Sequence, residues 1–144
     1  MTHYGDVETV LLVEDNPDDV FLMQRVFKKT RITARLLVVT DGKQAVGYLE
    51  GTGDYHDRQL YPLPDLVFLD LKLPFLHGFI VLAWIRKQAH LNEVHVIILT
   101  SSMEDQDREK AEAFGSPYLV KPPTPKMLLE AIRSLSLSIE PDGN

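Results

Sequence analysis

Acidic, hydroxyl and amine side chains directly follow short apolar runs of the sequence. Glu14 and Asp15 follow one run, Asp70 a second, Thr100 a third and Lys121 a fourth. Carboxylates that crowd together repel one another unless a cation lies among them, and a hard divalent ion with oxygen ligands suits them. Mg²⁺ fits best because it keeps several waters and completes its shell with phosphate oxygens. These residue types therefore predict a metal-assisted phosphate site.

Asp70 is the candidate nucleophile of this site. A carboxylate can attack phosphorus and give an aspartyl phosphate, while a metal ion and a lysine neutralise the charge on the transferred oxygens. The side chains meet only if the apolar runs lie in one sheet, because ligand sites of open parallel sheets lie at the carboxyl ends of the strands.

The pattern of apolar residues predicts such a sheet. Short β-branched runs alternate with longer amphipathic segments, the order that a parallel sheet with crossover helices produces. Most runs are almost wholly apolar, which favours interior positions in the sheet. The predicted strands are 9–13, 35–39, 65–69, 94–99 and 117–120; the first helix begins after Asn16, and the others cover about 41–50, 79–88, 104–114 and 125–137.

Local signals mark the ends of these helices. Asn16 and Asp41 are suitable N-caps, and Ser102 is assigned to capping the fourth helix. That helix is mostly polar, should pack lightly, and ends at Gly115, which suits a left-handed cap. The segment 51–64 is longer than the usual connection of about 2–6 residues and is interpreted as an insertion.

The bulk composition bounds the class of protein. A chain of 144 residues fits one domain, for which we expect an N-terminal extension at 1–8, a domain at 9–137 and a tail at 138–144. The lack of cysteine excludes disulfides, thiolate metal sites and thiol catalysis. A net charge of −6 argues against nucleic acid or an anionic membrane as the main partner. Without a bilayer-length apolar run or a signal peptide, we expect a cytoplasmic protein.

Four motifs together resemble the receiver domains of bacterial response regulators. They are Val-Glu-Asp-Asn at 13–16, Phe-Leu-Asp-Leu at 68–71, Leu-Thr-Ser at 99–101 and Tyr-Leu-Val-Lys-Pro at 118–122. Each motif is weak alone, but their order at strand ends is specific. The resemblance implies a single-domain α/β fold of the flavodoxin-like (βα)5 type, doubly wound around a five-stranded parallel sheet. It also implies a signalling protein rather than an enzyme, which accepts a phosphoryl group from a sensor histidine kinase and loses it slowly.

The resemblance assigns a role to each residue of the site. Asp70 would be phosphorylated, and Lys121 would contact the phosphoryl group. Glu14, Asp15, Asp70 and the backbone carbonyl of Lys72 would bind Mg²⁺, for which Mn²⁺ or Ca²⁺ could substitute.

The resemblance also implies how the signal is transmitted. Thr100 and Tyr118 resemble the family's switch pair, and the peptide bond between Lys121 and Pro122 should be cis. The loop at 51–64 makes the chain similar to the small regulators of bacterial and cyanobacterial phytochromes, which commonly lack an output domain. We therefore expect the chain to act as a homodimer, or on a separate effector, through the face of its fourth helix, fifth strand and fifth helix. The residues predicted on that face are Lys126, Glu130 and Arg133.

Two positions depart from the family pattern. Lys72 stands where the side chain is usually small and uncharged, so its ammonium could compete with the metal or steady the phosphate. His77 precedes Gly78 where an acidic residue is typical, and this should affect the loop more than the chemistry.

Other interpretations remain open at this point. Taken singly, Glu14 and Asp15 could merely cap the next helix, Thr100 could be an ordinary polar residue after a strand, and Tyr118 could only pack. Phosphatases of the haloacid dehalogenase type also form an aspartyl phosphate, but they use a second aspartate where this chain has Lys72. A flavodoxin-like cofactor binder needs a Ser/Thr/Gly-rich phosphate loop after the first strand, and this sequence has none there.

Overall fold

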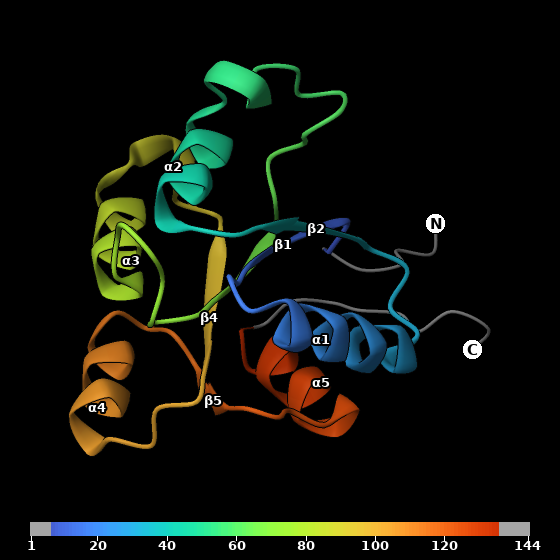
Figure 1. Cartoon of the computed structure of the whole chain (residues 1–144), viewed down its shortest axis with the longest axis vertical. Helices are drawn as coiled ribbons and strands as arrows, with labels where there is room; N and C mark the ends of the chain where they lie inside the picture. Colours follow the sequence, from blue (N-terminus) through green and yellow to red (C-terminus); the bar gives the residue numbers. More distant parts are fainter. Residues whose placement is uncertain (1–6, 136–144) are drawn as a thin grey trace.

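A single parallel sheet forms the centre of the protein (Figure 1). The computed structural model describes residues 7–135, and within this range five strands lie in the order β2-β1-β3-β4-β5. Their bounds are β1 Thr9–Val13, β2 Arg35–Val39, β3 Leu66–Leu69, β4 His95–Thr100 and β5 Tyr118–Val120. The predicted flavodoxin-like (βα)5 arrangement is thereby confirmed.

Helices cover both faces of the sheet (Figure 1). One face carries α1 and α5, which contact each other, and the other carries α2, α3 and the more peripheral α4. Their bounds are α1 Pro17–Thr30, α2 Gly42–Glu50, α3 Gly78–Lys87, α4 Asp105–Ala113 and α5 Pro125–Ser134, with short 3₁₀ turns at Gly53–Tyr55 and Ala89–Leu91.

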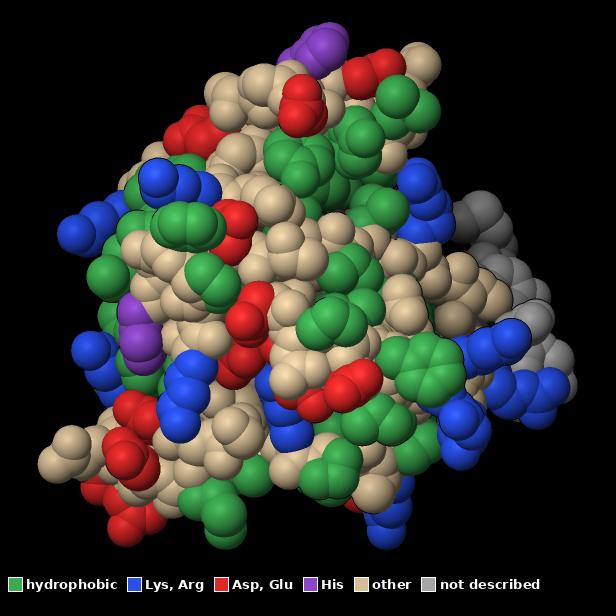
Figure 2. Space-filling model, viewed as in Figure 1, with side chains coloured by type: hydrophobic (Ala, Val, Ile, Leu, Met, Phe, Trp, Pro, Cys, Tyr) green, Lys and Arg blue, Asp and Glu red, His purple; other side chains and the backbone are tan. Residues whose placement is uncertain are grey.

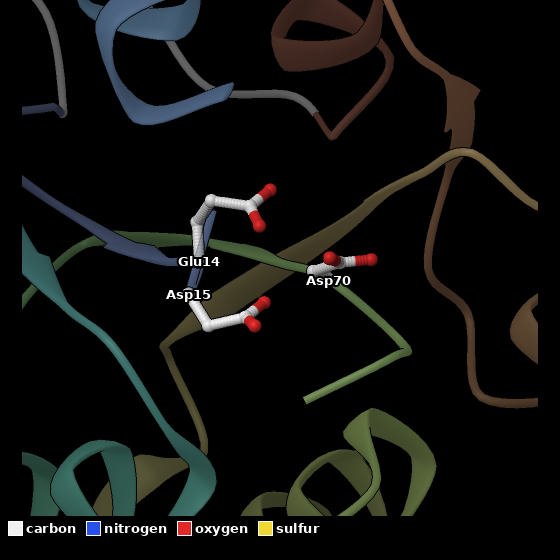
Figure 3. A group of neighbouring side chains, drawn as sticks. All are labelled: Glu14, Asp15 and Asp70. Atoms are coloured by element: carbon white, nitrogen blue, oxygen red, sulfur yellow. The ribbon is translucent and has the colours of Figure 1, made fainter. Parts of the chain in front are cut away.

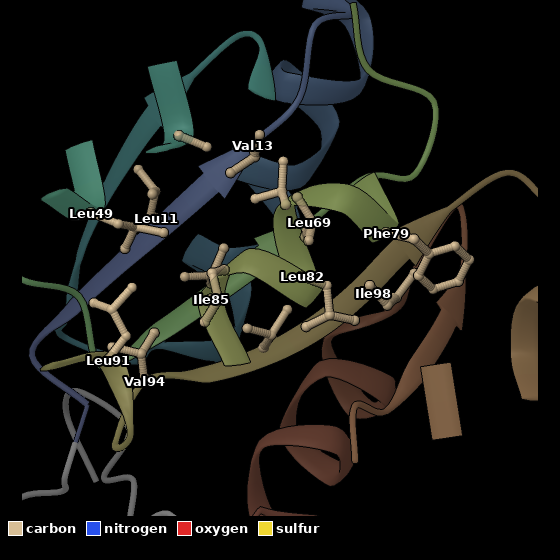
Figure 4. Packing of buried hydrophobic residues seen from close by; sticks show 14 of the residues in the cluster. Leu11, Val13, Leu49, Leu69, Phe79, Leu82, Ile85, Leu91, Val94 and Ile98 are labelled. Carbon is tan, nitrogen blue, oxygen red and sulfur yellow. The ribbon is translucent and has the colours of Figure 1, made fainter. Parts of the chain in front are cut away.

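Alternate residues of the central strands divide the core into two layers, because successive strand side chains point to opposite faces. Leu11 and Leu69 point towards α2 and α3, into the cluster drawn in Figure 4. Leu12 and Phe68, their neighbours in sequence, pack under α1 and α5. Both layers hold β1, β3 and β4 rigidly in register, which fixes where the residues after these strands lie.

The strand ends differ from the prediction in small ways. β3 begins at Leu66 rather than at Asp65, because the Asp65 carboxylate accepts the backbone N–H groups of Glu8 and Thr9 at 2.7 and 3.0 Å. β4 is shifted by one residue and includes Thr100, whose Cα pairs with that of Val120. β5 begins after the predicted Pro117, a residue that has no N–H to donate to a ladder.

The interior positions that the apolar runs favoured are wrong for two strands. β2 and β5 lie at the two edges of the sheet, and their side chains are mostly only half-buried. An apolar run does not distinguish an edge strand that one helix layer partly covers from a central strand.

The helix starts were predicted well for α1 and α2 and less well for α4. The Asn16 side chain accepts the N–H groups of Asp18 and Asp19, and Asp41 accepts that of Gln44, as N-caps do. The assignment of Ser102 as a cap is wrong, since Glu104 precedes the first residue of α4.

Ser102 instead ties the loop before α4 to the first turn of that helix. Its hydroxyl accepts the Glu104 N–H at 3.3 Å and donates to Asp107 at 2.6 Å. Ala111 is the one buried residue of α4, as expected for a lightly packed helix, and Gly115 has the predicted left-handed conformation with φ of 73°.

The remaining helix ends differ from the prediction by a few residues. α3 begins and ends one residue earlier than predicted, and α5 ends at Ser134. The predicted tail at 138–144 and most of the predicted extension at 1–8 lie outside the described residues. Val7, near the end of that extension, is buried in the core beneath α1 and α5.

The predicted insertion at 51–64 is held by three tyrosines and an arginine. The ring centroids of Tyr48 and Tyr55 lie 5.2 Å apart, and those of Tyr55 and Tyr61 lie 5.1 Å apart. The Tyr48 hydroxyl donates to the Pro62 carbonyl at 2.8 Å. Arg58 donates to the carbonyls of Tyr48 and Leu49 at 2.7 and 2.9 Å, and so caps the end of α2.

A shallow groove lies between α3 and α4. It encloses about 380 Å³, and its lining includes three aromatic residues and two lysines. The lining residues are Phe79, Ile80, Ala83, Trp84, Lys87, Lys110 and Phe114.

Among residues 7–135, no helix is both long and apolar enough to cross a membrane.

Candidate functional site

Three carboxylates meet at the carboxyl ends of β1 and β3 (Figure 3). Glu14 and Asp15 directly follow β1, and Asp70 directly follows β3. These two strands are paired, with Val13 opposite Leu69, so the residues after them are neighbours. One carboxylate oxygen of each residue lies within 4.8 Å of those of the other two. The predicted acidic cluster therefore exists in the fold.

Lys121 completes the cluster from the end of β5. Its ammonium donates to Glu14 Oε1, to Asp19 Oδ2 at 3.0 Å and to Asp70 Oδ2 at 3.1 Å. An ammonium has three hydrogens to donate, and each has an acceptor here. The side chain is only 12% exposed, and the bond from Lys121 to Pro122 is cis, which confirms that prediction.

Burial sets the charge states of the cluster. The pKa of Glu14 is raised to about 7, mainly by burial and also by the neighbouring Asp70 charge, although the hydrogen bonds from Lys121 and from the Asn16 N–H act to lower it. Burial by itself would lower the pKa of Lys121, but its hydrogen bonds to Glu14 and Asp19 and the charge of Asp70 hold it above its ordinary value. The lysine is therefore charged, and the acids need more positive charge than one lysine supplies.

The donor atoms of the cluster suit a hard divalent cation. All three residues offer carboxylate oxygens, which are the ligands that Mg²⁺ and similar ions prefer. Asp15 is exposed and Glu14 and Asp70 are buried, so a cation bound here would face solvent on one side. The Lys72 side chain is exposed, and its backbone N–H lies 3.4 Å from Asp70 Oδ1.

Gly78 lets the loop after Asp70 fold back closely. A Cβ atom at this position would lie 2.3 Å from the Asp70 carbonyl oxygen and 2.7 Å from Leu71 Cα. The Gly78 N–H donates to the Leu71 carbonyl at 2.8 Å. His77 caps α3 with its ring, because Nδ1 accepts the Phe79 N–H at 3.1 Å. His77 thus acts on the loop and the helix start.

Thr100 and Tyr118 both contact the loop between β4 and α4. Thr100 is fully buried, and its hydroxyl accepts the Ser102 N–H at 3.3 Å. The Tyr118 hydroxyl donates to the Ser102 carbonyl at 2.8 Å, while the Arg108 guanidinium lies 4.8 Å from the centre of the ring. The interpretation that Tyr118 only packs is therefore incomplete.

The residues predicted for the output face lie away from this cluster, on α5. Lys126 and Glu130 form an exposed pair at 3.9 Å, and Arg133 is exposed. The structure brings together Glu14, Asp15, Asp70 and Lys121. The metal role of the Lys72 carbonyl and the roles of Thr100 and of the α5 residues stay predictions.

Sequence reasoning missed Asp19. An acidic residue in the first turn of α1 is already accounted for by the helix dipole, which favours carboxylates there.

Comparison with known proteins identifies related sequences and folds. Residues 10–133 match the family described as response regulator receiver domain. The chain is 37% identical over 114 residues to the probable methanogenesis regulatory protein FilR2 of Methanothrix harundinacea, covering 78% of this chain and 71% of that protein. It is 33% identical over 129 residues to the response regulator Rcp1 of Synechocystis, covering 89% of this chain and 86% of that one.

Solved structures of response regulators have a similar fold. The bacteriophytochrome response regulator AtBRR superposes with a TM-score of 0.84 at 34% identity, covering 96% of this chain and 99% of that one. The Mn²⁺-bound form of Rcp1 superposes with a TM-score of 0.73 at 32% identity, covering 90% of this chain and 91% of that one.

Proposed function

This chain belongs to the family of response regulator receiver domains, and we propose from that premise that Asp70 is the residue on which it accepts a phosphoryl group. A receiver domain works in two-component signalling, where its donor is a histidine kinase. The observation that carries the assignment is the position of the Asp70 carboxylate, which contacts the Lys121 ammonium at 3.1 Å and lies within 4.8 Å of the other two acids.

The transfer step uses these residues directly. A carboxylate oxygen of Asp70 forms a bond to phosphorus while the bond from phosphorus to the donor's histidine nitrogen breaks. Lys121 is 3.1 Å from that carboxylate and is charged, so it is placed to bind an oxygen of the incoming group. Slow attack by water on the same phosphorus would return Asp70 to its free form.

The divalent ion that we propose is Mg²⁺. Glu14, Asp15, Asp70 and the backbone carbonyl of Lys72 would hold it, with Mn²⁺ or Ca²⁺ as substitutes. A relative, Rcp1, has been solved with Mn²⁺, which supports a divalent ion at an acidic cluster of this kind. When bound, the ion supplies positive charge next to the transferred oxygens.

The kinase that we propose as donor is a phytochrome. AtBRR is a bacteriophytochrome response regulator, and it covers nearly the whole of this chain. The ordered insertion at 51–64, with its tyrosine cluster, is the feature that suggested this group of regulators from the sequence.

We further propose that residues 9–137 are the receiver domain and that it signals as a homodimer through α4, β5 and α5. The outer side of α5 carries Lys126 and Arg133, whereas α4 is rich in acids such as Asp105 and Glu109. In a twofold-symmetric dimer the same surface of both protomers forms the interface. The basic α5 of each protomer would then face the acidic α4 of the other. Tyr118 lies between these helices and links the face to the loop that holds Thr100.

Labelling tests the assignment of Asp70. The protein is incubated with Mg²⁺ and a small phosphodonor such as acetyl phosphate, and the product is analysed by intact mass and peptide mapping. We expect one phosphoryl group per chain, on the peptide that contains Asp70. Asp70→Asn should abolish labelling with little change in unfolding temperature, and the exposed Asp54→Asn should label like the natural sequence. Stoichiometric labelling of Asp70→Asn would contradict the assignment.

A further inference from the structure

Asp19 is a carboxylate of the site that the proposed chemistry does not yet use. It lies in the first turn of α1 and accepts from the Lys121 ammonium at 3.0 Å, as close as the contact of Asp70 with the same ammonium at 3.1 Å. The Asp19 side chain is 33% exposed and the Lys121 side chain 12%, so the ion pair is largely withdrawn from solvent. A pair of this kind holds a lysine more firmly than an exposed surface pair does.

The other two partners of Lys121 have further tasks in the proposed reaction. Glu14 is one of the acids that would hold the divalent ion. Asp70 would form the bond to phosphorus, so its oxygen would no longer be free to accept from the lysine as a carboxylate. Asp19 alone among the three acceptors neither binds the ion nor receives the phosphoryl group in this scheme. Its contact with Lys121 can therefore persist throughout the reaction.

Packing does not hold the lysine in place by itself. A cavity of about 300 Å³ lies beside Lys121, with mainly apolar walls that include Leu22, Met23 and Leu99. Asp19 is on the wall of the same cavity. A lysine has a flexible stem of four carbons, so without a fixed acceptor on this side its ammonium has other orientations available.

We propose that Asp19 is a positioning residue for phosphoryl transfer, which holds the Lys121 ammonium in reach of the phosphoryl oxygens when Glu14 and Asp70 are engaged. The proposal rests on the assignment of Asp70 and Lys121 made above. Its effect is on rate, because an amine that must first be ordered contributes less to stabilising the transferred oxygens.

Asp18 provides a matched control. Asp18 and Asp19 are adjacent acids in the same first turn of α1, and the backbone N–H of each donates to the Asn16 side chain. Both carboxylates therefore interact with the helix dipole in the same way. Asp18, however, is exposed and forms no ion pair within residues 7–135. An effect of helix stability or of net charge would therefore appear both when Asp18 and when Asp19 is replaced by asparagine. An effect that depends on Lys121 would appear only when Asp19 is replaced.

The experiment measures the second-order rate constant of phosphorylation by acetyl phosphate at saturating Mg²⁺. We expect Asp19→Asn to lower it about tenfold, the scale of one lost hydrogen bond to a charged group, and Asp18→Asn to change it by less than about twofold. Asp19→Glu should recover part of the rate, because it restores the carboxylate at a slightly altered reach. Equal rates for Asp19→Asn and Asp18→Asn would overturn the proposal.

A double-mutant cycle shows whether Asp19 acts through Lys121. In a Lys121→Met background, Asp19→Asn should have no further effect on the rate, because the group that it positions is gone. An additional tenfold loss in that background would also overturn the proposal, since Asp19 would then act independently. The affinity for Mg²⁺ alone and the unfolding temperature should be similar in Asp19→Asn and Asp18→Asn.

The outcomes separate this proposal from the assignment of Asp70. If the natural sequence does not label, or labels elsewhere, the proposed function fails. If it labels on Asp70 and Asp19→Asn matches its control, only the role of Asp19 fails.

Discussion

At the scale of single residues, the two acids after β1 are neighbours in sequence but differ in surroundings. Asp15 is exposed, and its carboxylate has no ion pair among residues 7–135, so it can bind an ion without giving up another contact. Glu14 is buried, contacts Lys121, and accepts the Asn16 N–H at 3.2 Å. With a pKa raised to about 7, Glu14 is only partly ionised near neutral pH, and the protonated fraction must lose its proton before it can serve as a ligand.

We therefore predict that Asp15→Ala weakens Mg²⁺ binding more than Glu14→Ala. Loss of an outer partner of a metal site costs about 10–100-fold in affinity, and loss of a direct ligand should cost at least as much, so Asp15→Ala should weaken binding by about tenfold or more. Calorimetric titration of the three proteins with Mg²⁺ measures this. Equal losses in the two variants would show that both acids bind the ion in the same way.

The strand-end residues could be predicted from sequence because each directly follows an apolar run, and parallel strands place their carboxyl ends together. Glu14, Asp15, Asp70 and Lys121 were found in this way. Asp19 was not, because an acid in a first helical turn already has a sufficient explanation in the helix dipole.

At the scale of elements, the insertion at 51–64 is built onto the end of α2. Tyr48 is a residue of α2 that is 1% exposed, and its hydroxyl donates to the Pro62 carbonyl at the far end of the insertion. Burial raises the pKa of Tyr48 to about 12. The folded state thus binds the phenolic proton more tightly than the unfolded chain does, in which the pKa is about 10. This contribution to stability is complete below pH of about 10 and is lost as pH rises through about 12.

Tyr48→Phe should show this dependence. At pH 8 we expect the variant to be about 1 kcal/mol less stable, because the half-buried Pro62 carbonyl loses its donor. Above pH of about 10, the natural sequence should lose stability relative to the variant by about 1.4 kcal/mol per pH unit. Urea denaturation at pH 8 and pH 11 measures both effects.

Tyr61→Phe is the control for this experiment. The Tyr61 ring lies in the same cluster, but its hydroxyl has no hydrogen bond within residues 7–135. At pH 8 the free energy of unfolding of Tyr61→Phe should therefore be close to that of the natural sequence. If Tyr48→Phe keeps the same stability difference at both pH values, the phenol of Tyr48 does not titrate as its burial indicates.

The sequence predicted which segments are strands and helices, but not where each strand lies in the sheet. The alternation of short apolar runs with amphipathic segments was sufficient to predict five βα units. It could not separate edge strands from central ones, because β2 and β1 have equally apolar sequences and only the order of the strands decides which is covered on both faces. Ser102 was misassigned because Glu104, not a hydroxyl residue, occupies the cap position of α4.

At the scale of the whole molecule, the chemistry and the proposed output face are joined by one short loop. Both contacts are made at Ser102, in the segment between β4 and α4. The Thr100 hydroxyl accepts the Ser102 N–H, and the Tyr118 hydroxyl donates to the Ser102 carbonyl. α4 beyond it buries only Ala111. A new phosphoryl group that draws Thr100 towards the site would therefore shift a loop whose helix resists little.

We predict that a phosphate mimic strengthens dimerisation and that Tyr118→Ala and Arg133→Glu reduce this effect. Arg133→Glu places a negative charge opposite the acids of α4 and should raise the dimer dissociation constant about tenfold or more, that is, by about 1.4 kcal/mol. Sedimentation velocity with and without beryllofluoride and Mg²⁺ measures this. Arg25→Glu, an exposed change on α1, is the control. If neither variant differs from the control in either state, the α4, β5 and α5 face is not the output surface.

The groove between α3 and α4 also makes the protein its own optical reporter. The chain has a single tryptophan, and Trp84 lies in the wall of this groove with Lys110 of α4 among its neighbours in the lining. Tryptophan fluorescence can be excited where tyrosine does not absorb, so the emission comes from this one position and the tyrosines of the insertion do not contribute. We expect a displacement of α4 that alters this groove to change the polarity around the indole, and hence the wavelength and intensity of its emission. The kinetics of activation can thus be followed in the natural sequence without attaching a dye.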